Sequence, residues 1–444
     1  MLYKQKLRKS EEIAELIESG DTINFGYCTG TSRYVDKALA NRIRNDELCD
    51  LKIIGGTLQW EPEIFKADPE GANFVWYSEH AAFERKRIND NAGVYIPLRY
   101  SELPRYYTDD NLGRIDYSII QVSPMNEYGQ FNFGPNASHM ASVVKTAKTI
   151  IVEVNENMPI CFGNNNSINI KDVNYIVEGD NPKIPGIKGK SISEIDLKVA
   201  NYIIPEIHDG ACLQLGIGGM PNAVGKKIAE SDLKDLGVHT EMYVDAFMEM
   251  EKAGKITGKR KTTNPNKQAY TFAAGSSELY EYINLNNTLH IDQVDYINDV
   301  RVISSNKNFI SINNAINVDL LGQVASENMG LKHVSGAGGQ LDFVLGSYLS
   351  EGGKSFICLS STFIDNKGDC HSRIQPYLIS GTSVTVTRHV VQWIVTEFGM
   401  FNCKGKSIWE RAEGIINLAH PYYREDLIKE AEKMNIWVKT NKRI

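Results

Sequence analysis

The sequence predicts an α/β protein composed of two similar halves. Short runs of β-favouring apolar residues alternate with amphipathic stretches along the whole chain, the pattern of strands alternating with helices. Two segments also repeat: residues 20–30 match residues 210–220 at an offset of 190, and residues 122–131 match residues 315–324 at an offset of 193. Two similar offsets from separate segments indicate a duplicated α/β unit.

The individual elements follow from local periodicity. Runs rich in β-branched and aromatic residues, bounded by turn residues, predict strands at 22–25, 51–54, 118–122, 149–154, 213–215 and 356–359. Amphipathic stretches predict helices at 10–19, 34–43, 222–229, 408–419 and 424–434, the last of them after Pro421, a residue tolerated at a helix start. Residues 1–20 contain no apolar segment, so they predict a surface helix rather than an export signal.

The boundary between the halves is predicted near the middle of the chain. Residues 177–190 contain three glycines and two prolines, so they are typical of a linker. We therefore expect an N-terminal α/β domain over residues 1–185 and a C-terminal α/β domain over residues 190–444. Sites in such folds lie at the carboxyl ends of strands and between domains, so the glycine turns of the two halves are candidates for one shared cleft.

Composition excludes several classes of protein. The chain has 444 residues, with 48 Lys and Arg against 55 Asp and Glu, and this net charge of −7 with no basic block argues against nucleic-acid binding. No apolar run approaches the ~18 residues that would span a bilayer, so no membrane segment is expected. The seven cysteines are widely spaced and contain no CxxC, and the histidines lack metal-ligand spacing. The sequence therefore predicts a cytoplasmic protein without disulfides or a metal site.

Two glycine-rich segments are candidates for binding an anion. In Leu215-Gly-Ile-Gly-Gly-Met-Pro-Asn-Ala-Val, a strand enters a turn whose backbone N–H groups could hold an oxyanion or a phosphate. The pattern departs from the dinucleotide fingerprint because the third glycine is missing and Pro221 intervenes. In Ser335-Gly-Ala-Gly-Gly-Gln-Leu-Asp-Phe, three glycines could form a second nest of donors. A plain tight turn and a flexible loop remain alternatives for the two segments.

Side chains that could act in catalysis lie close to these turns. Residues 238–245 predict the next strand of the second half, where Glu241 and Asp245 supply carboxylates that could act as base or nucleophile. Asn313 could present an amide donor, although an asparagine at a strand end also serves as a local backbone cap. His239 and His371 lie near these segments, and a structural role is the alternative for each. Residues 388–397 predict a strand, and we assign no role to its arginine.

Together these segments resemble the acetyl-CoA hydrolase/transferase group of family I CoA-transferases. Besides the two glycine segments, the resemblance rests on His239-Thr-Glu-Met, on Val395-Thr-Glu-Phe-Gly and on Ala419-His-Pro, in this order along nearly the whole chain. Three N-terminal motifs are similar to those of the butyryl-CoA:acetate CoA-transferases within the group. These motifs are Tyr27-Cys-Thr-Gly-Thr, Arg99-Tyr-Ser-Glu-Leu-Pro-Arg-Tyr-Tyr and Phe131-Asn-Phe-Gly-Pro.

The resemblance implies a fold and a set of site residues. It implies two duplicated domains of the NagB/RpiA/CoA-transferase-like type with the active site between them, and assembly into a homodimer or homotetramer. The catalytic glutamate of the family falls on Glu241, and oxyanion donors fall on the Ile217 backbone, Asn313 and the Gly338-Gly339 turn. The positions that match CoA-contacting residues are Gly216, Ile217, Gly218, Gly219, Met220, Ile316, Gly338 and Gly339. Two departures, Arg33 and Ala81, could change the preferred acid if they line the acyl pocket.

The activity implied is transfer of CoA from butyryl-CoA to acetate, in butyrate fermentation, through a glutamyl-CoA thioester and ping-pong kinetics. CoA and acyl-CoA would be substrates, short-chain carboxylates the partners, and no cofactor would be tightly bound. Four alternatives stay open: a 4-hydroxybutyrate or a succinyl- or propionyl-CoA:acetate transferase, an acyl-CoA hydrolase, a regulator that binds a nucleotide or sugar phosphate, and a nicotinamide-dependent oxidoreductase.

Overall fold

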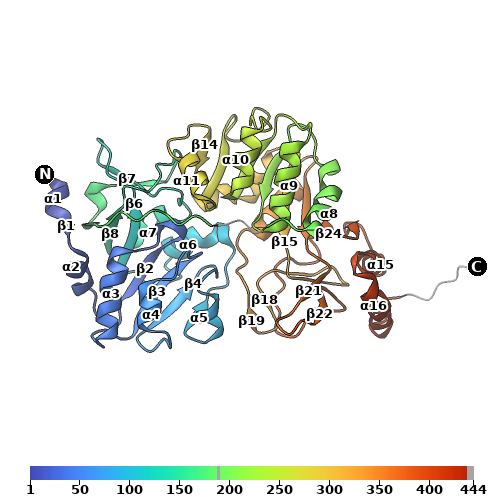
Figure 1. Ribbon diagram of the computed structural model, residues 1–444, viewed down its shortest axis with the longest axis horizontal. Coiled ribbons are helices and arrows are strands. Elements are labelled where there is room, and N and C mark those ends of the chain that lie inside the picture. The colour runs from blue at the N-terminus through green and yellow to red at the C-terminus, as the bar shows by residue number, and fades with distance from the viewer. Residues whose placement is uncertain (188–190, 438–444) are drawn as a thin grey trace, which may run out of the picture.

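The computed structural model describes residues 1–187 and 191–437. Two α/β halves lie side by side along the long axis of the molecule, with the N-terminal half in blue and cyan and the C-terminal half in green to red (Figure 1). Each half contains one large, mostly parallel sheet with helices packed against it. The α/β class predicted from alternating strands and helices is confirmed.

The first large sheet belongs to the N-terminal half. Its strands are β1 (Leu7–Arg8), β2 (Thr22–Tyr27), β3 (Leu51–Gly56), β4 (Phe74–Ser78), β5 (Gly93–Tyr95), β6 (Tyr117–Val122), β8 (Thr149–Val154) and β10 (Tyr175–Glu178). They lie in the order β1-β10-β8-β6-β2-β3-β4-β5, and every neighbouring pair is parallel. A separate antiparallel pair is formed by β7 (Gln130–Asn132) and β9 (Ser167–Asn169).

The helices of this half are α1 (Leu2–Lys6), α2 (Ser10–Glu15), α3 (Tyr34–Arg44), α4 (Glu63–Ala67), α5 (Arg85–Asn89), α6 (Leu103–Thr108) and α7 (Met140–Thr146). The 3₁₀ turns are η1 (Cys28–Gly30), η2 (Tyr100–Glu102) and η3 (Ile170–Asp172). The N-terminal segment differs from the single surface helix that its polarity predicted. It folds as two short helices around β1, because Leu7 and Arg8 pair with β10 and extend the sheet.

The second large sheet belongs to the C-terminal half. Its strands are β11 (Cys212–Leu215), β12 (Gly237–Tyr243), β13 (Gln268–Ala273), β14 (Leu289–Ile291), β15 (Phe309–Asn314), β20 (Lys354–Cys358), β24 (Trp393–Thr396) and β25 (Gly399–Asn402). They lie in the order β14-β13-β12-β11-β15-β20-β24-β25, and β25 alone of the described strands in this sheet runs antiparallel to its neighbour.

Smaller strands and the remaining helices complete this half. The small strands are β16 (Asn317–Asp319), β17 (Val324–Ala325), β18 (Asn328–Met329), β19 (Lys332–His333), β21 (Thr362–Ile364), β22 (Cys370–Ser372) and β23 (Ile374–Gln375). The helices are α8 (Glu194–Ile203), η4 (Ile204–Glu206), α9 (Gly219–Glu230), α10 (Asp245–Lys252), α11 (Ser277–Ile283), α12 (Val294–Ile297), α13 (Val300–Ser305), α14 (Gln340–Leu349), α15 (Ile408–Leu418) and α16 (Pro421–Lys433).

The strand orders of the two sheets establish the duplication. The run β10-β8-β6-β2-β3-β4-β5 of the first sheet corresponds, strand by strand, to β24-β20-β15-β11-β12-β13-β14 of the second. The repeat seen in the sequence aligns β2 with β11. Both are central strands of their sheets and are followed by a turn and a helix. The prediction of two similar α/β units is therefore confirmed, because one strand order accounts for both halves.

The two halves pack against each other through backbone as well as side chains. Thr271 of β13 accepts a hydrogen bond from the Ser138 N–H at 3.0 Å, and Val294 donates to the Ser138 carbonyl at 2.8 Å. Phe272 and Val294 of the second half belong to the same buried apolar cluster as Tyr27 and Tyr100 of the first. This shared core holds the carboxyl ends of β2 and β12 beside one another.

Some predicted boundaries shift. The helix predicted from residue 424 begins at Pro421, and only Trp393–Thr396 of the strand predicted over 388–397 is extended. Of the predicted linker, residues 179–187 contain neither helix nor strand, and residues 188–190 lie outside the described residues. The domain limits of 185 and 190 stay predictions.

In residues 1–187 and 191–437, no helix is both long and apolar enough to cross a bilayer.

Candidate active site

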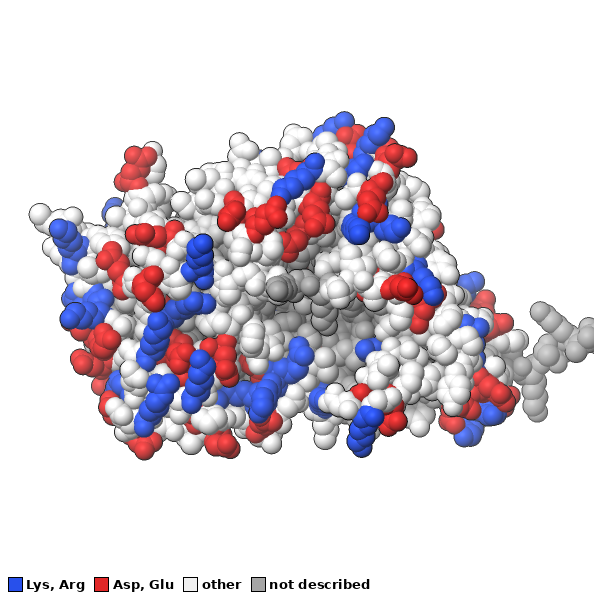
Figure 2. All heavy atoms as spheres, viewed as in Figure 1, with Lys and Arg blue, Asp and Glu red and all other residues white. Residues whose placement is uncertain are grey.

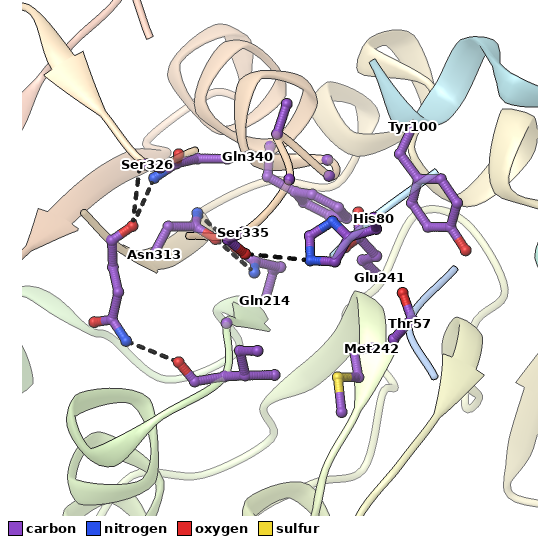
Figure 3. A pocket seen from close by; sticks show the side chains of 18 of the residues that line it. Thr57, His80, Tyr100, Gln214, Glu241, Met242, Asn313, Ser326, Ser335 and Gln340 are labelled. Atoms are coloured by element: carbon purple, nitrogen blue, oxygen red, sulfur yellow. Dashed lines mark hydrogen bonds between the residues drawn. The ribbon is translucent and has the colours of Figure 1, made fainter. Parts of the chain in front are cut away.

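A cavity lies between the two halves, and both contribute to its wall (Figures 2 and 3). The N-terminal half supplies Tyr27, Thr57, Glu79, His80, Leu98 and Tyr100. From the C-terminal half come the ends of β11, β12 and β15 and the glycine loop before α14. The predicted shared cleft thus exists, and the segments singled out in the sequence meet in it.

Glu241 enters this cavity from β12. The strand places the residue near its carboxyl end, and the neighbouring Met242 also lines the cavity (Figure 3). The Asn298 side-chain Nδ2 donates a hydrogen bond to Glu241 Oε2 at 2.7 Å. The Gly339 N–H donates a second hydrogen bond to the same carboxylate. One carboxylate is therefore held by donors from two other parts of the chain.

The environment of Glu241 favours its neutral form more than water does. Burial raises the pKa of this carboxyl to about 7, and the negative charge of Asp342 adds to the increase. The hydrogen bonds from Asn298 and Gly339 act in the opposite direction, because they stabilise the carboxylate. Near neutral pH the side chain therefore exists in both forms, and the ionised form is poorly solvated, as an attacking nucleophile requires.

The second glycine segment allows the backbone to approach this carboxylate. A Cβ on Gly339 would lie 2.1 Å from Glu241 Oε2 and also 2.1 Å from Asn298 Nδ2. Gly338 adopts a φ of +54°, a conformation that L side chains rarely take, and its Cβ would lie 3.4 Å from Glu241 Oε1. Of the two predictions for this segment, a nest of backbone donors and a flexible loop, the geometry supports the nest of donors, since the Gly339 N–H donates to Glu241.

The first glycine segment is divided between the cavity and the core. Gly216 and Ile217 line the cavity, and Ile217 is 58 % exposed, so it stands at the open side. Gly218, Gly219 and Met220 are not among the cavity-lining residues of the described chain. Gly219 begins α9 and its Cβ would lie 2.5 Å from Asp196 of α8, whereas Met220 packs into the hydrophobic core. Packing of α9 accounts for Gly219 and Met220, and contact of all three residues with CoA stays a prediction.

Asn313 faces the cavity but does not cap a turn. Its amide exchanges two hydrogen bonds with the amide of Gln214 across β11 and β15, each 3.1 Å long. Because both residues line the cavity, the pair presents polar groups to it from adjacent strands. Ile316, another predicted contact, also lines the cavity. Gln214 was not expected from the sequence, since an amide pair across two strands leaves no local pattern.

The closed side of the cavity is aromatic. Tyr27 stacks on Tyr100 with ring centroids 5.8 Å apart, and Phe272 packs against both at 6.0 and 6.2 Å. Leu98 lines the same cavity and belongs to the same buried cluster. Sequence reasoning missed this wall because its members come from distant segments. Tyr27 and Tyr100 both belong to motifs that carried the family resemblance, but nothing in those motifs places the two rings together.

The remaining candidates take structural positions. Arg33 stacks on Trp60 with its guanidinium carbon 3.9 Å from the ring centroid, and neither it nor Ala81 is among the described lining residues. The His239 ring is fully buried, its Nε2 lies 2.6 Å from the Ile297 carbonyl oxygen, and burial lowers its pKa to about 3. Asp245, the first residue of α10, accepts a hydrogen bond from the Ser276 N–H and lies outside the cavity. In the parts of the chain that the structure describes, no group of three acidic, His or Cys side chains could hold a metal.

Comparison with known proteins adds independent evidence. Residues 1–187 match the acetyl-CoA hydrolase/transferase N-terminal domain, and residues 275–431 match the C-terminal domain of the same name. The chain is 53 % identical to a butyryl-CoA:acetate CoA-transferase of Anaerostipes caccae, with 99 % of each chain aligned. It is 47 % identical to a probable butyrate:acetyl-CoA coenzyme A-transferase of Syntrophomonas wolfei, over 99 % of this chain and 98 % of that one.

Two solved structures have the same fold along the whole chain. RipA from Yersinia pestis superposes with a TM-score of 0.87 at 33 % sequence identity. A 4-hydroxybutyrate CoA-transferase from Porphyromonas gingivalis superposes with a TM-score of 0.80 at 29 % sequence identity. Each comparison covers 98 % of this chain and 99 % of the other. With both halves matched in sequence and in structure, and with a partly buried glutamate between glycine loops in the cleft, the chain belongs to the acetyl-CoA hydrolase/transferase family.

Proposed function

We propose that this protein is a butyryl-CoA:acetate CoA-transferase in which Glu241 forms the covalent intermediate. The observation that carries the proposal is the Glu241 carboxylate, placed in a cleft between two halves with hydrogen-bond donors from Asn298 and Gly339 and a glycine loop beside it. The two relatives of 53 % and 47 % identity support butyryl-CoA and acetate as the substrates.

The reaction proceeds by two acyl substitutions. Glu241 Oε1 attacks the thioester carbonyl of butyryl-CoA, a C–O bond forms, and the C–S bond breaks to release CoA thiolate. The thiolate then attacks Cδ of the resulting anhydride, forms a C–S bond, and expels butyrate with the electrons of the Cδ–Oε1 bond. Acetate enters and the two steps run in reverse to acetyl-CoA, so no proton is consumed.

The surroundings of Glu241 suit these steps. Each addition places negative charge on a carbonyl oxygen, and the backbone donors of the glycine turns together with the Asn313 amide are available to stabilise it, each contributing on the order of 2.7–4 kcal/mol. The exposed Ile217 loop leaves room for the CoA moiety at the open side. The aromatic wall of Tyr27, Tyr100 and Phe272 provides an apolar end for the short acyl chain and keeps water from the anhydride.

The decisive experiment is capture of the intermediate. After incubation with butyryl-CoA and proteolysis, mass spectrometry should find CoA attached to the peptide that contains Glu241. Initial rates with varied butyryl-CoA and acetate should give the parallel lines of a ping-pong mechanism. Absence of the adduct together with sequential kinetics would contradict the proposal, and butyryl-CoA loss that needs no acetate would indicate a hydrolase instead.

The rate of adduct formation should depend on the ionisation of Glu241. Since the carboxylate is the nucleophile and burial raises its pKa to about 7, single-turnover rates are expected to rise with pH through about 7 and to level off above it. Quenched-flow mass spectrometry between pH 5 and 9 measures this profile. A rise centred near the ordinary glutamate value of 4.5 would contradict the environment described for Glu241.

The choice of acid should depend on the aromatic end of the cavity. Replacing Leu98 with alanine removes apolar volume from this wall, so hexanoate should gain relative to butyrate as acceptor, by roughly 10-fold in kcat/KM. Acceptor profiling with acetyl-CoA as donor and acids of two to six carbons measures the ratio. Phe83, an exposed aromatic side chain, is the control, because Phe83→Ala should leave the profile unchanged.

A further inference from the structure

We propose that Tyr95 is a positioning residue, which fixes the glycine loop before α14 (residues 335–339) so that the Gly339 N–H reaches the Glu241 carboxylate. The inference rests on the proposed function, because it assigns Tyr95 an effect on the covalent steps at Glu241. Tyr95 is not among the described residues that line the cavity, and none of the sequence motifs contains it. It therefore acts through the loop and not through contact with a substrate.

Tyr95 extends from the edge of the first sheet to the glycine loop. It is the last residue of β5, and β5 is the last strand in the order of that sheet. Its hydroxyl accepts a hydrogen bond from the Ala337 N–H at 3.0 Å and donates to Glu327 Oε2 at 3.4 Å. Its ring packs on the His333 ring, with the centroids 4.4 Å apart. A side chain of the N-terminal half thus holds a backbone group two residues before Gly339.

The next peptide unit of the loop is also held by the N-terminal half. The Tyr100 N–H donates to the Gly338 carbonyl at 3.2 Å. Because the carbonyl of Gly338 and the N–H of Gly339 belong to one planar peptide unit, this hydrogen bond fixes the plane of the Gly339 donor. Gly338 has a φ of +54°, and glycine rotates easily about its backbone bonds. The direction of the donor therefore depends on restraints on both sides of Gly338, and Tyr95 supplies the one at Ala337.

The base of the loop is anchored in the C-terminal half. The Glu327 carbonyl accepts hydrogen bonds from the Val334 N–H at 2.8 Å and the Ser335 N–H at 2.9 Å. Glu327 Oε1 accepts from Thr385 Oγ1 at 2.8 Å, while its Oε2 faces the Tyr95 hydroxyl. Glu327 therefore connects the base of the loop with the hydroxyl that holds its tip.

Other side chains of the N-terminal half hold the segment farther from α14. Helix α5 lies beside β19 (Figure 1), and Asn89 at its end exchanges two hydrogen bonds of 2.9 Å with the His333 backbone. His80 Nε2 lies 3.4 Å from Ser335 Oγ (Figure 3). Of these three side-chain contacts, the one from Tyr95 is nearest to α14 along the chain. It is therefore the contact best placed to control the Gly339 donor.

The position of the loop matters because the Gly339 N–H donates to a group that reacts. When CoA thiolate attacks Cδ of the anhydride, a C–S bond forms and the carbonyl electron pair of Glu241 moves onto its oxygen. Collapse returns that pair and breaks the bond from Cδ to the butyryl oxygen, so that butyrate leaves with the bonding electrons. A backbone donor already aimed at the Glu241 carboxyl group costs no reorganisation at that moment, whereas a displaced loop loses this advantage.

The test removes only the hydroxyl of Tyr95. Tyr95→Phe keeps the ring against His333 but leaves the Ala337 N–H without its acceptor. In single turnovers, formation of the Glu241–CoA adduct should slow by roughly 10- to 100-fold, because a displacement of ~1 Å at a catalytic group has an effect of this order. The KM for butyryl-CoA should stay within about threefold of wild type, since Tyr95 lies outside the described cavity lining.

Tyr117→Phe is the matched control. This hydroxyl also belongs to the N-terminal half and donates to a backbone group, the Leu16 carbonyl, at 2.6 Å. Tyr117 is the first residue of β6 and is not among the described residues that line the cavity. Its variant should form the adduct at the wild-type rate per folded molecule.

The pH profile separates positioning from folding. The hydrogen bond from Gly339 stabilises the Glu241 carboxylate, so its weakening in Tyr95→Phe should raise the pKa of Glu241 and move the acid limb of adduct formation to higher pH. A general loss of stability would not cause this change, and Tyr117→Phe should keep the wild-type profile. The titratable and charged groups that face Glu241, Tyr95 or the loop from other elements are unchanged in Tyr95→Phe. They are Tyr27, Glu79, His80, Arg85, Arg99, Tyr100, Tyr106, Glu327, His333 and Asp342.

Hydrogen exchange measures the loop itself, without a substrate. Peptides that cover residues 333–340 should exchange faster in Tyr95→Phe than in wild type, because the Ala337 N–H has lost its acceptor. Peptides that cover β8, in the middle of the first sheet, should exchange at the wild-type rate.

Each outcome decides the proposal. Slow adduct formation, a shifted acid limb and faster exchange confined to the loop in Tyr95→Phe support the positioning role. A wild-type rate and pH profile overturn it and leave the covalent mechanism intact. Faster exchange along the whole chain also overturns it, because slow turnover would then reflect general destabilisation. Absence of the adduct in the wild-type enzyme overturns both the covalent mechanism and the role of Tyr95 in it.

Discussion

Replacing Glu241 with glutamine is expected to lower the kcat for CoA transfer by roughly 10⁴-fold or more, because an amide cannot supply the carboxylate oxygen that attacks the thioester. Glutamine has nearly the same shape, so binding of butyryl-CoA should change little. Steady-state kinetics and isothermal titration with butyryl-CoA measure the two quantities. Activity near that of wild type would remove Glu241 from the mechanism.

Two further measurements sharpen this result. Glu241→Asp keeps the charge but withdraws the carboxylate by about one bond length, and a displacement of ~1 Å should cost roughly 10²-fold in kcat. Glu241→Gln should also melt at a higher temperature than wild type at pH 8 and approach it near pH 5. The sign follows from linkage: the folded-state pKa is raised to about 7, so stability decreases as pH rises between 4.5 and 7, and glutamine is free of this penalty.

Replacing Gly339 with alanine is expected to lower kcat by roughly 10²-fold or more. The added Cβ would lie 2.1 Å from both Glu241 Oε2 and Asn298 Nδ2, so the carboxylate, its donor or the backbone N–H must move. The backbone itself imposes no obstacle, since φ is −97° at this residue. Loss of activity would therefore come from displaced groups and not from a strained turn. Quenched-flow measurement of adduct formation locates the defect in the covalent steps.

The matched control lies on the helix that follows. Gly346 of α14 is also crowded, because its Cβ would lie 2.4 Å from Ile303 Cγ2, but it is not among the described residues that line the cavity. Gly346→Ala should lose thermal stability and keep its activity per folded molecule. If both glycine variants lost activity equally, overpacking of α14 and not contact with Glu241 would be responsible.

Much of the fold could be predicted because its signals are local. Strands such as Thr149–Val154 are buried on both faces of a parallel sheet, so they form continuous apolar runs that stand out in the sequence. The duplication was recognisable because β2 and β11 retained similar glycine turns. The short strand β1 was missed, since two residues paired with a distant strand carry no periodicity of their own.

The candidate site divides in the same way. Glu241, Gly216, Ile217, Asn313, Ile316, Gly338 and Gly339 were proposed from motifs, and the structure brings all of them to one cavity. The catalytic and CoA-binding roles of these residues stay predictions, as do the homo-oligomeric state and the cytoplasmic location. Gly218, Gly219 and Met220 shared the motif but lie outside the described lining, where Gly219 packs against α8 and Met220 packs into the core.

The sequence by itself determined the α/β class, the duplication, the family and the carboxylate on which the proposed chemistry depends. Each of these is encoded in short contiguous segments, so it can be recognised without knowledge of the three-dimensional structure. Only the tertiary structure decided which groups surround that carboxylate: the Asn298 donor, the Asp342 charge, the Gln214–Asn313 pair and the aromatic wall of the N-terminal half. These contacts join residues far apart in the chain, and burial, which raises the pKa of Glu241, exists only once the two halves close around it.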